Sequence, residues 1–145
     1  MKTVYGNCID IDGNGIVILG KSGMGKSDLT YRLIENYNAK LVSDDHMIIT
    51  AKNNNLIARP AKSISGLIEI RNIGIIKTDH IKETKIKLVV ELDDRENLER
   101  MPEDVFLEFG DIKIKKIKLN AFEQSTELKI ITALKIELGV IEKIS

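Results

Sequence analysis

Residues 20–27 read Gly-Lys-Ser-Gly-Met-Gly-Lys-Ser and fit G-x-x-x-x-G-K-[ST], the pattern of a loop that binds phosphate groups. The short, apolar and β-branched run at residues 16–19 comes directly before this pattern and predicts a buried strand. After the pattern, Leu29, Leu33 and Ile34 recur at the spacing of a helix. Strand, glycine-rich loop and helix, in that order, are the context in which the pattern binds nucleotides.

The chemistry of the loop supports this interpretation. Glycines adopt positive φ and let the backbone approach a ligand, so that successive N–H groups point at an anion. The helix adds its unpaired N–H groups and its positive dipole end. Lys26 would reach the β- and γ-phosphates of a nucleotide, and the Ser27 hydroxyl would bind Mg²⁺. The predicted nucleotide-binding residues are Gly20, Lys21, Ser22, Gly23, Met24, Gly25, Lys26 and Ser27.

The composition of the 145 residues is that of one compact domain, with 43% hydrophobic and 30% charged residues. Because the formal net charge is zero, no basic surface predicts a nucleic-acid partner. Cys8 is the single cysteine, so no disulfide can form within the chain, and we expect it to be a small buried hydrophobe. Neither a signal-peptide pattern nor a membrane-spanning apolar run occurs, which predicts a cytoplasmic protein without a membrane partner.

Most of the chain is predicted to form strands joined by tight turns. Turn signals at residues 12–15, 52–55 and 110–111 each separate two apolar runs and predict three hairpins. The first hairpin pairs a strand over residues 3–11 with the strand that leads into the loop. One helix follows the loop, and a second, near the C-terminus, begins after Ser125. We therefore expect a strand-rich α/β fold with hairpins, without strict alternation of strands and helices.

Two further expectations concern the C-terminal part of the chain. Along residues 112–119 the apolar positions change parity at Lys115-Lys116, which predicts a β-bulge there. The C-terminal helix is expected to bury a face that includes Leu128 and to end at Gly139.

Two adjacent carboxylates, Asp44 and Asp45, close the strand predicted at residues 39–43. In proteins with a phosphate-binding loop, an acidic residue at the end of a neighbouring strand faces the γ-phosphate and its metal. Since successive side chains of an extended chain point in opposite directions, at most one of the two faces the reaction centre. A polar turn that only caps the strand is the alternative. His46 comes next and either titrates with these carboxylates or is a surface turn residue.

Glu69 and Arg71 are ionisable residues in the otherwise apolar stretch 66–76. Because burying either one without a partner would be costly, each must pair or face a charged ligand. Their spacing of two predicts that they share one face of a strand. They form either a structural ion pair, or a metal-facing carboxylate and a phosphate-facing guanidinium, and the sequence leaves both open.

Three motifs, in this order and spacing, resemble the HPr kinase/phosphorylase family: G-K-S-G-M-G-K-S at residues 20–27, L-V-S-D-D at residues 41–45 and I-E-I-R-N-I-G-I at residues 68–75. The resemblance extends from Thr3 to the C-terminal helix and is to the short form of the family, the catalytic domain alone. It implies that residues 1–145 form a single HPr kinase/phosphorylase-like catalytic domain. The implied fold is an α/β P-loop kinase domain similar to that of phosphoenolpyruvate carboxykinases.

The resemblance also implies an activity and its partners. The family phosphorylates a serine of HPr, a small phosphocarrier protein, with ATP and Mg²⁺, and it removes that phosphate with inorganic phosphate. We therefore expect a protein-serine kinase that acts on HPr or an HPr-like carrier. We also expect a homo-oligomer, since members of the family are often hexamers. A small-molecule P-loop kinase and a nucleotide-binding regulatory module without catalysis are the alternatives.

Matching positions in the family imply roles for individual residues. Lys26 would hold the phosphates of the nucleotide. Asp44 would take the serine proton in the forward direction and return it in the reverse direction. Ser27 and Glu69 would hold Mg²⁺. Asp45 and Arg71 are adjacent to these residues, and we expect them to belong to the catalytic residues together with Asp44 and Lys26.

Two positions depart from the pattern of the family. Tyr5 stands where the family has a histidine near the catalytic aspartate, and a tyrosine can hydrogen-bond a carboxylate but is not a base at neutral pH. Residues 118–124 contain no arginine, whereas the long form has a loop with proline and arginine there that is tied to dephosphorylation. These departures favour kinase activity over phosphorylase activity.

Overall fold

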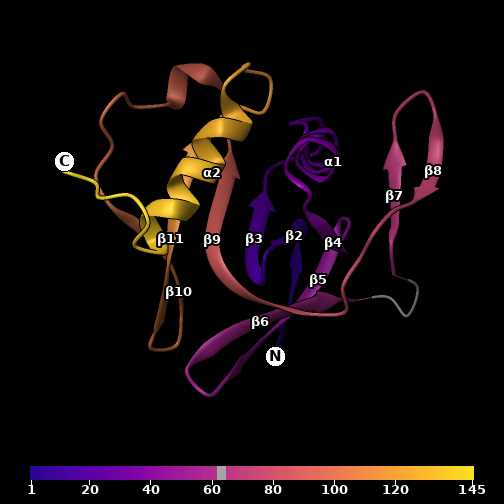
Figure 1. Ribbon diagram of the computed structural model, residues 1–145, viewed down its shortest axis with the longest axis horizontal. Coiled ribbons are helices and arrows are strands. Elements are labelled where there is room, and N and C mark those ends of the chain that lie inside the picture. Colours follow the sequence, from indigo (N-terminus) through magenta and orange to yellow (C-terminus); the bar gives the residue numbers. More distant parts are fainter. Residues whose placement is uncertain (62–64) are drawn as a thin grey trace.

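The computed structural model describes residues 1–61 and 65–145 (Figure 1). The helices of this part of the chain are α1 (Lys26–Tyr37) and α2 (Thr126–Glu137), and a short 3₁₀ turn, η1 (Arg95–Asn97), precedes β10. The strands are β1 (Lys2–Tyr5), β2 (Asn7–Ile11), β3 (Asn14–Leu19), β4 (Lys40–Ser43), β5 (His46–Lys52), β6 (Asn55–Pro60), β7 (Leu67–Ile70), β8 (Gly74–Lys77), β9 (Thr84–Leu92), β10 (Val105–Phe109) and β11 (Ile112–Leu119).

A large sheet positions the loops that matter for function. Its strands lie in the order β1-β5-β6-β9-β3-β2-β4, with β11 also paired to β9 and β10 paired to β11. β3, β9 and β11 are parallel, and β4 runs in the same direction because β2 is antiparallel to both β3 and β4. The carboxyl ends of β4, β3, β9 and β11 therefore lie at one edge of the sheet, the edge at which α/β proteins bind their ligands.

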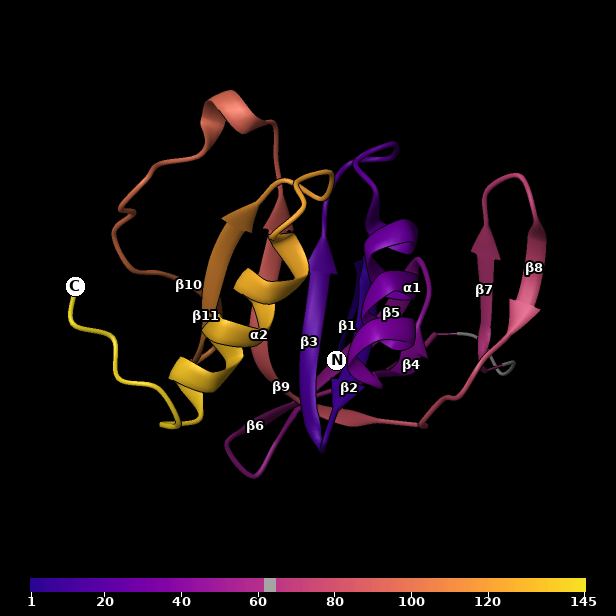
Figure 2. The same ribbon diagram turned by 45° about the horizontal axis from the view of Figure 1, so that its top comes forward.

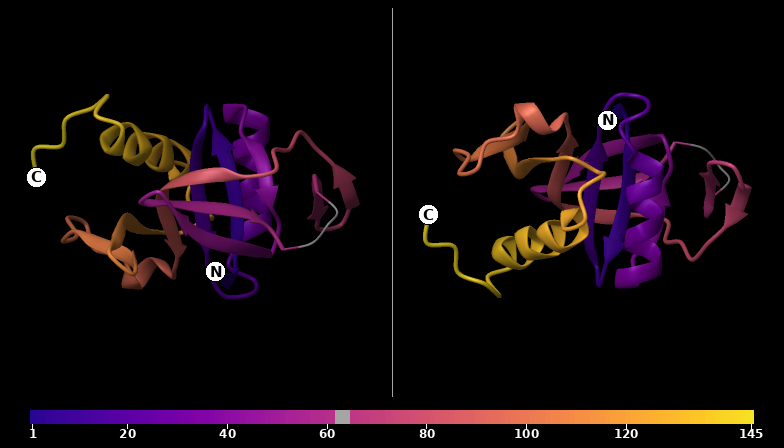
Figure 3. Two further views of the ribbon diagram at one scale, coloured as in Figure 1. Left: turned by 90° about the horizontal axis from the view of Figure 1, so that it is seen from below. Right: turned by 90° about the horizontal axis from the view of Figure 1, so that it is seen from above.

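Both helices pack on the same face of this sheet, as Figure 2 shows. Leu29 and Leu33 of α1 are buried in one cluster with Ile130 and Leu134 of α2 and with alternate side chains of β3 and β9. On the opposite face, Cys8 is buried in a second cluster with side chains of β5 and β6. β7 and β8 form a separate ribbon that stands at the opposite end of the molecule from the C-terminus (Figure 3).

The strand expected over residues 3–11 is divided in two at Gly6, so that prediction was wrong. β1 pairs with β5, whereas β2 pairs with β3 and β4. A Cβ atom at Gly6 would lie 2.7 Å from the carbonyl oxygen of Ile18 and 2.9 Å from Cδ2 of Leu19. The chain can pass this close to β3 only where the residue has no side chain.

The other expected elements are present with small changes in their bounds. Hairpins join β2 to β3, β5 to β6 and β10 to β11. α1 is followed by Asn38, a left-handed residue with φ 58°. α2 is followed by Leu138 as its C-cap and then by Gly139, with φ 76°. Within the ranges that the structure describes, no helix is long and apolar enough to cross a membrane.

The C-terminal part of the chain differs from expectation in two details. β11 keeps an unbroken register with β10 through Lys115 and Lys116, so the predicted β-bulge was wrong. The apolar side chains change parity there because Ile114 packs in the cluster with β5 and β6, while Ile117 packs under the helices on the opposite face. On α2, Leu128 is 59% exposed instead of buried.

Candidate active site

The loop at residues 20–25 connects β3 to α1 in the conformation that its glycines permit. Gly23 and Gly25 have φ of 87° and 91°, in the left-handed region that residues with a side chain rarely adopt. Gly25 is the N-cap of α1, and its carbonyl oxygen accepts a hydrogen bond from the N–H of Leu29 at 2.9 Å. The N–H groups of the first turn of α1 have no helical partner and can bind an anion.

Lys26, the first residue of α1, folds its side chain back over this loop. Its ammonium group donates to the carbonyl oxygens of Gly20 at 2.6 Å and of Lys21 at 3.3 Å. A phosphate oxygen is a charged and therefore stronger acceptor for the same group. Lys26 is thus positioned to exchange these carbonyl contacts for a phosphate bound to the loop.

The carboxylate of Asp44 reaches the start of α1 from the end of β4. Its Oδ1 atom accepts hydrogen bonds from Ser27 Oγ at 2.9 Å and from Asn7 Nδ2 at 3.0 Å. Its Oδ2 atom accepts a long, exposed hydrogen bond from the backbone N–H of Glu69 at 3.4 Å. Two donors therefore fix one carboxylate oxygen, and the other keeps the capacity to accept a proton from a substrate.

Asn7 links three elements beneath this carboxylate, a role that sequence reasoning missed. Its side chain is fully buried. Its Nδ2 atom donates to Oγ1 of Thr30 as well as to Asp44, each at 3.0 Å, and its Oδ1 atom accepts from the backbone N–H of Asp45 at 2.9 Å. An asparagine in an otherwise apolar strand is the signal that could have revealed this residue, because buried polar groups are hydrogen-bonded.

Asp45 directs its carboxylate to solvent, whereas Asp44 contacts Ser27 at the start of α1. Asp45 has φ 76°, and its Oδ2 atom lies 3.4 Å from Nδ1 of His46 without the geometry of a hydrogen bond. The ring of Tyr5 packs edge-on against His46, with 4.7 Å between ring centroids, and is 71% exposed. Among the described residues, Tyr5 makes no hydrogen bond to Asp44.

The β7–β8 ribbon carries Glu69 and Arg71, but they do not share one strand, so that prediction was wrong. Glu69 lies in β7, whereas Arg71 begins the turn into β8, in which Asn72 has φ 71°. Both side chains are exposed, and neither forms an ion pair with a residue that the structure describes. Of the two alternatives left open by the sequence, the mutual ion pair therefore does not hold. Both residues line the cleft beside the loop.

A cleft of 950 Å³ between the phosphate loop and the β7–β8 ribbon brings most of the predicted site residues together. This volume is in the range of sites for small ligands and cofactors. Three predicted residues do not line the cleft: Gly20, Lys21 and Met24. The predicted residues in its wall are Ser22, Gly23, Gly25, Lys26, Ser27, Asp44, Asp45, Glu69 and Arg71.

The donor atoms at this cleft suit Mg²⁺. Ser27 offers a hydroxyl oxygen, and Asp44 and Glu69 offer carboxylate oxygens, which are the hard ligands that Mg²⁺ prefers. In residues 1–61 and 65–145, no three His, Cys, Asp or Glu side chains cluster as a cage for a metal ion. Mg²⁺ in kinases is commonly held by one or two carboxylates together with substrate phosphates, so this sparse set fits a metal that arrives with a nucleotide.

These features define an α/β domain built around a phosphate-binding loop, with a carboxylate held beside Ser27 in the first turn of the helix that follows the loop. A family model described as HPr Serine kinase C-terminal domain matches residues 1–140. The chain belongs to this family, and the resemblance carried by its three motifs is confirmed.

Two relatives give the extent of the similarity. The chain is 42% identical over 91 residues to the HPr kinase/phosphorylase of Mycoplasma mycoides subsp. mycoides SC, a match that covers 58% of this chain and 29% of that protein. It is 31% identical over 128 residues to the HPr kinase/phosphorylase of Mycoplasmopsis pulmonis, a match that covers 80% of this chain and 41% of that protein. The chain therefore spans less than half the length of these relatives.

A solved structure gives the same result for the fold. The Hpr(Ser) kinase/phosphatase from Coxiella burnetii superposes with a TM-score of 0.84 at 25% sequence identity. The match covers 99% of this chain and 100% of that chain. The predicted fold class, a strand-rich α/β fold with one helix after the loop and one near the C-terminus, is confirmed.

Proposed function

We propose that this chain is an ATP- and Mg²⁺-dependent protein-serine kinase whose substrate is HPr or an HPr-like phosphocarrier, and that residues 1–145 act as one catalytic domain. The observation that carries the proposal is the contact of Asp44 with Ser27, 2.9 Å from Oδ1 to Oγ, at the start of α1. It brings a proton acceptor to the point where a phosphate loop holds the terminal phosphate of a nucleotide. Membership of the family supports HPr as the kind of substrate.

In the forward reaction the residues of the loop bind and orient ATP. The N–H groups of the loop and the ammonium group of Lys26 hold the β- and γ-phosphates and offset the negative charge on their oxygens. The hydroxyl oxygen of the substrate serine attacks the γ-phosphorus, the bond to the bridging oxygen breaks, and ADP leaves. Asp44 accepts the serine proton, because Ser27 and Asn7 fix Oδ1, while Oδ2 accepts only a long, exposed hydrogen bond from the N–H of Glu69.

The remaining predicted residues surround this reaction. Ser27 and Glu69 would hold Mg²⁺, which supplies charge neutralisation at the phosphoryl oxygens when it is bound with ATP. Asp45 and Arg71 are exposed at the mouth of the cleft, where they can contact the phosphate groups or the incoming protein. Because the residues around Asp44 at the mouth of the cleft are open to solvent, a serine on a protein surface can approach them. This openness favours a protein substrate over a small molecule.

The same site supports the reverse reaction in chemical terms. An oxygen of inorganic phosphate would attack the phosphorus of phosphoserine, the bond from phosphorus to the serine oxygen would break, and pyrophosphate would leave. Asp44 in its protonated form would return the proton to the serine oxygen. Since residues 118–124 contain no arginine, we expect this phosphorolysis to be slower than the kinase reaction.

One observation favours a second function, in which the chain binds nucleotide without transferring phosphate. Tyr5 is 71% exposed against His46 and makes no hydrogen bond to Asp44 within the described part of the chain. If Asp44 needs a neighbouring base in order to accept the serine proton, phosphate transfer would be slow in this protein. Tight binding of ATP without phosphate transfer is the outcome that would favour this regulatory function.

Self-association is part of the proposal. The surface of α2 and the residues that follow it expose apolar side chains, among them Leu128 at 59%, Val140 at 69% and Ile144 at 86%. Exposed large apolar side chains are candidates for contacts between subunits. Light scattering during size-exclusion chromatography would give the mass of the particle, and we expect a homo-oligomer such as a hexamer. A monomer at micromolar concentration would contradict this part of the proposal.

Intact-mass spectrometry of purified HPr tests the proposed activity. HPr is incubated with this protein, ATP and Mg²⁺, and we expect the addition of one phosphate. Asp44→Asn should abolish the addition while leaving ATP binding intact. Asp111→Asn, in the exposed turn between β10 and β11, is the matched control and should leave the addition unchanged. Unmodified HPr in the presence of bound ATP would refute the kinase reaction on HPr.

A further inference from the structure

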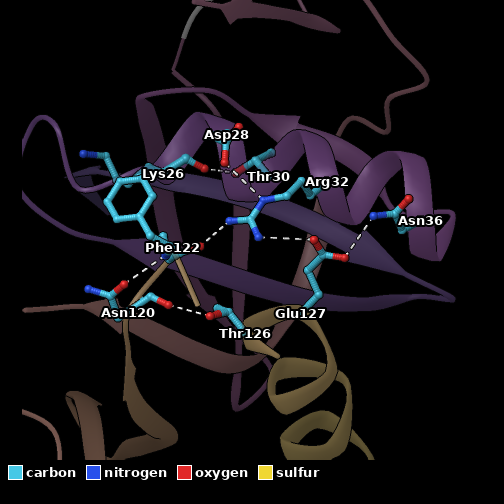
Figure 4. Close-up of polar contacts among 10 residues, drawn as sticks. Lys26, Asp28, Thr30, Arg32, Asn36, Asn120, Phe122, Thr126 and Glu127 are labelled. Carbon is cyan, nitrogen blue, oxygen red and sulfur yellow. Dashed lines mark hydrogen bonds and ion pairs between the residues drawn. The ribbon is translucent and has the colours of Figure 1, made fainter. Parts of the chain in front are cut away.

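Phe122 is a large aromatic side chain that stays 66% exposed at the wall of the cleft. It lies between β11 and α2 and contacts the phosphate loop, since a Cβ atom at Gly25 would lie 3.1 Å from its ring atoms Cε1 and Cζ. Figure 4 shows the ring at the N-terminal end of α1, on the side of Lys26. An exposed ring held against a phosphate loop presents a flat apolar surface to whatever the loop binds.

A polar network fixes the backbone at Ala121 and Phe122 (Figure 4). Arg32 of α1 donates to the carbonyl oxygen of Ala121 and also to Oε1 of Glu127 at 3.3 Å. The N–H of Phe122 itself donates to Oδ1 of Asn120 at 3.0 Å. The ring is therefore carried by backbone that is tied to α1, the same helix that begins at the phosphate loop.

Asp44 and Phe122 approach the loop from opposite sides. In the sheet, β4 lies two strands away from β3 across β2, and β11 lies two strands away from β3 across β9. Asp44 follows β4, and Phe122 follows β11. A nucleotide whose terminal phosphate lies beside Asp44 and Ser27 therefore directs its nucleoside toward the side from which Phe122 projects.

We propose that Phe122 is the platform on which the nucleobase of the bound nucleoside triphosphate stacks, an inference that rests on the proposed nucleotide-dependent function. The phosphate loop binds only the phosphate groups of a nucleotide, so a separate contact is needed to bind the base. Every nucleobase presents a π face to an aromatic ring, and this contact needs no hydrogen bonds to the edge of the base. Phe122 therefore contributes to the binding of ATP and of GTP alike.

The test compares a ligand that has a base with one that lacks it. Calorimetric titration, with Mg²⁺ present, measures the Kd of ATP and of inorganic triphosphate for the wild type, Phe122→Ala and Phe122→Trp. Loss of a stacked base typically weakens binding by about tenfold or more, so we expect that increase in the Kd of ATP for Phe122→Ala. The Kd of inorganic triphosphate should not change, and Phe122→Trp should keep the wild-type Kd of ATP.

Phe106→Ala is the matched control, because Phe106 is also a partly exposed phenylalanine, 44% exposed, and lies on β10 outside the cleft. It should change neither Kd. Equal weakening of ATP and inorganic triphosphate by Phe122→Ala would mean that the ring only supports the loop, and unchanged binding of both ligands would also overturn the inference. An increase only in the KM of the protein substrate would assign Phe122 to protein recognition instead. If the wild type bound neither ligand, the proposed function itself would fail.

Discussion

The side-chain amide of Asn7 donates a hydrogen bond of 3.0 Å to the carboxylate of Asp44, although the two residues are 37 positions apart in the chain. Asn7 is fully buried and also contacts Thr30 and the backbone N–H of Asp45. One side chain of β2 thus fixes the proposed proton acceptor, the residue after it and the helix that begins at the phosphate loop. In a site that works by positioning, such a residue controls the rate without touching the substrate.

Replacement of Asn7 by alanine should therefore lower both stability and catalysis. The substitution removes the partner of the Asp45 backbone N–H, while Thr30 and Asp44 each lose one of their hydrogen bonds. Loss of a partner at a buried polar group typically costs about 1–3 kcal/mol in the free energy of unfolding. With Asp44 no longer fixed, we expect kcat for HPr phosphorylation to fall while the Kd of ATP stays near the wild-type value. Urea unfolding and steady-state kinetics, assayed well below the unfolding temperature, measure the two effects separately.

Asn14→Ala is the control for this experiment. Asn14 is also an asparagine of the first hairpin, and its side chain hydrogen-bonds the carbonyl oxygen of Ile11 at 3.1 Å, away from the cleft. It should lower stability slightly and leave kcat unchanged. If Asn7→Ala kept the wild-type kcat in protein that is still folded, Asn7 would serve stability alone.

Ser27 should be needed for its hydroxyl group. Ser27→Ala removes an oxygen that can bind Mg²⁺ as well as the hydrogen bond to Asp44. Loss of a group that orients or binds a metal typically weakens metal affinity by about tenfold or more, so the Mg²⁺ concentration for half-maximal activity should rise by that factor. Ser27→Thr keeps the hydroxyl and should restore the wild-type dependence. A Mg²⁺ titration in which all three proteins coincide would remove Ser27 from the metal site.

The phosphate loop was predictable because its signal is local. The apolar run of β3, the glycines and the helical spacing after Lys26 occupy one continuous stretch, and the structure forms strand, loop and helix there. Asp44 was predictable for a related reason, since a carboxylate at the carboxyl end of a neighbouring parallel strand lies at the same edge as the loop. These inferences depend on chain order and strand direction, not on the details of packing.

The errors concern contacts between distant parts of the chain. Gly6 breaks the first strand because β3 lies too close to it for a side chain. The residues around Gly6 in the sequence do not reveal that β3 will be its neighbour in the fold. The stretch that contains Arg71 was expected to be one strand, although its residues fold back as the β7–β8 hairpin. Phe122 could not be placed either, because its position beside Gly25 depends on the pairing of β11 with β9.

Cys8 should make the stability of the protein sensitive to alkaline pH. Burial strongly raises the pKa of the Cys8 thiol, and the charge of Asp10 adds to the shift. The unfolded chain ionises its cysteine at about pH 8.5, so above that pH the unfolded state loses a proton that the folded state keeps. The free energy of unfolding should be unaffected by this group below about pH 8.5 and should fall above it by up to about 1.4 kcal/mol per pH unit.

Urea unfolding of the wild type and of Cys8→Ala across this pH range measures the effect. The variant lacks the thiol, so its stability should decline less steeply above about pH 8.5. The buried thiol should also resist alkylation until the protein unfolds. Rapid alkylation of the native protein near neutral pH would show that Cys8 is accessible.

Gly25 and Gly13 offer a comparison that separates backbone strain from crowding at the site. Both are glycines in the left-handed region, with φ of 91° and 87°. A Cβ atom at Gly13 would meet no atom within 4 Å, whereas one at Gly25 would lie 3.0 Å from Cβ of Ala121 and 3.1 Å from the ring of Phe122. Gly13→Ala should therefore cost only the strain of the left-handed backbone, about 1–2 kcal/mol in the free energy of unfolding.

Gly25→Ala should cost more than Gly13→Ala in the same urea experiment, because the new methyl group also pushes against the segment before α2. It should in addition weaken the binding of ATP and of inorganic triphosphate together, since the turn that presents the N–H groups is distorted for any phosphate ligand. Gly13→Ala should leave both affinities unchanged. Equal stability and equal affinities in the two variants would mean that the contact between Gly25 and Phe122 relaxes freely and does not shape the loop.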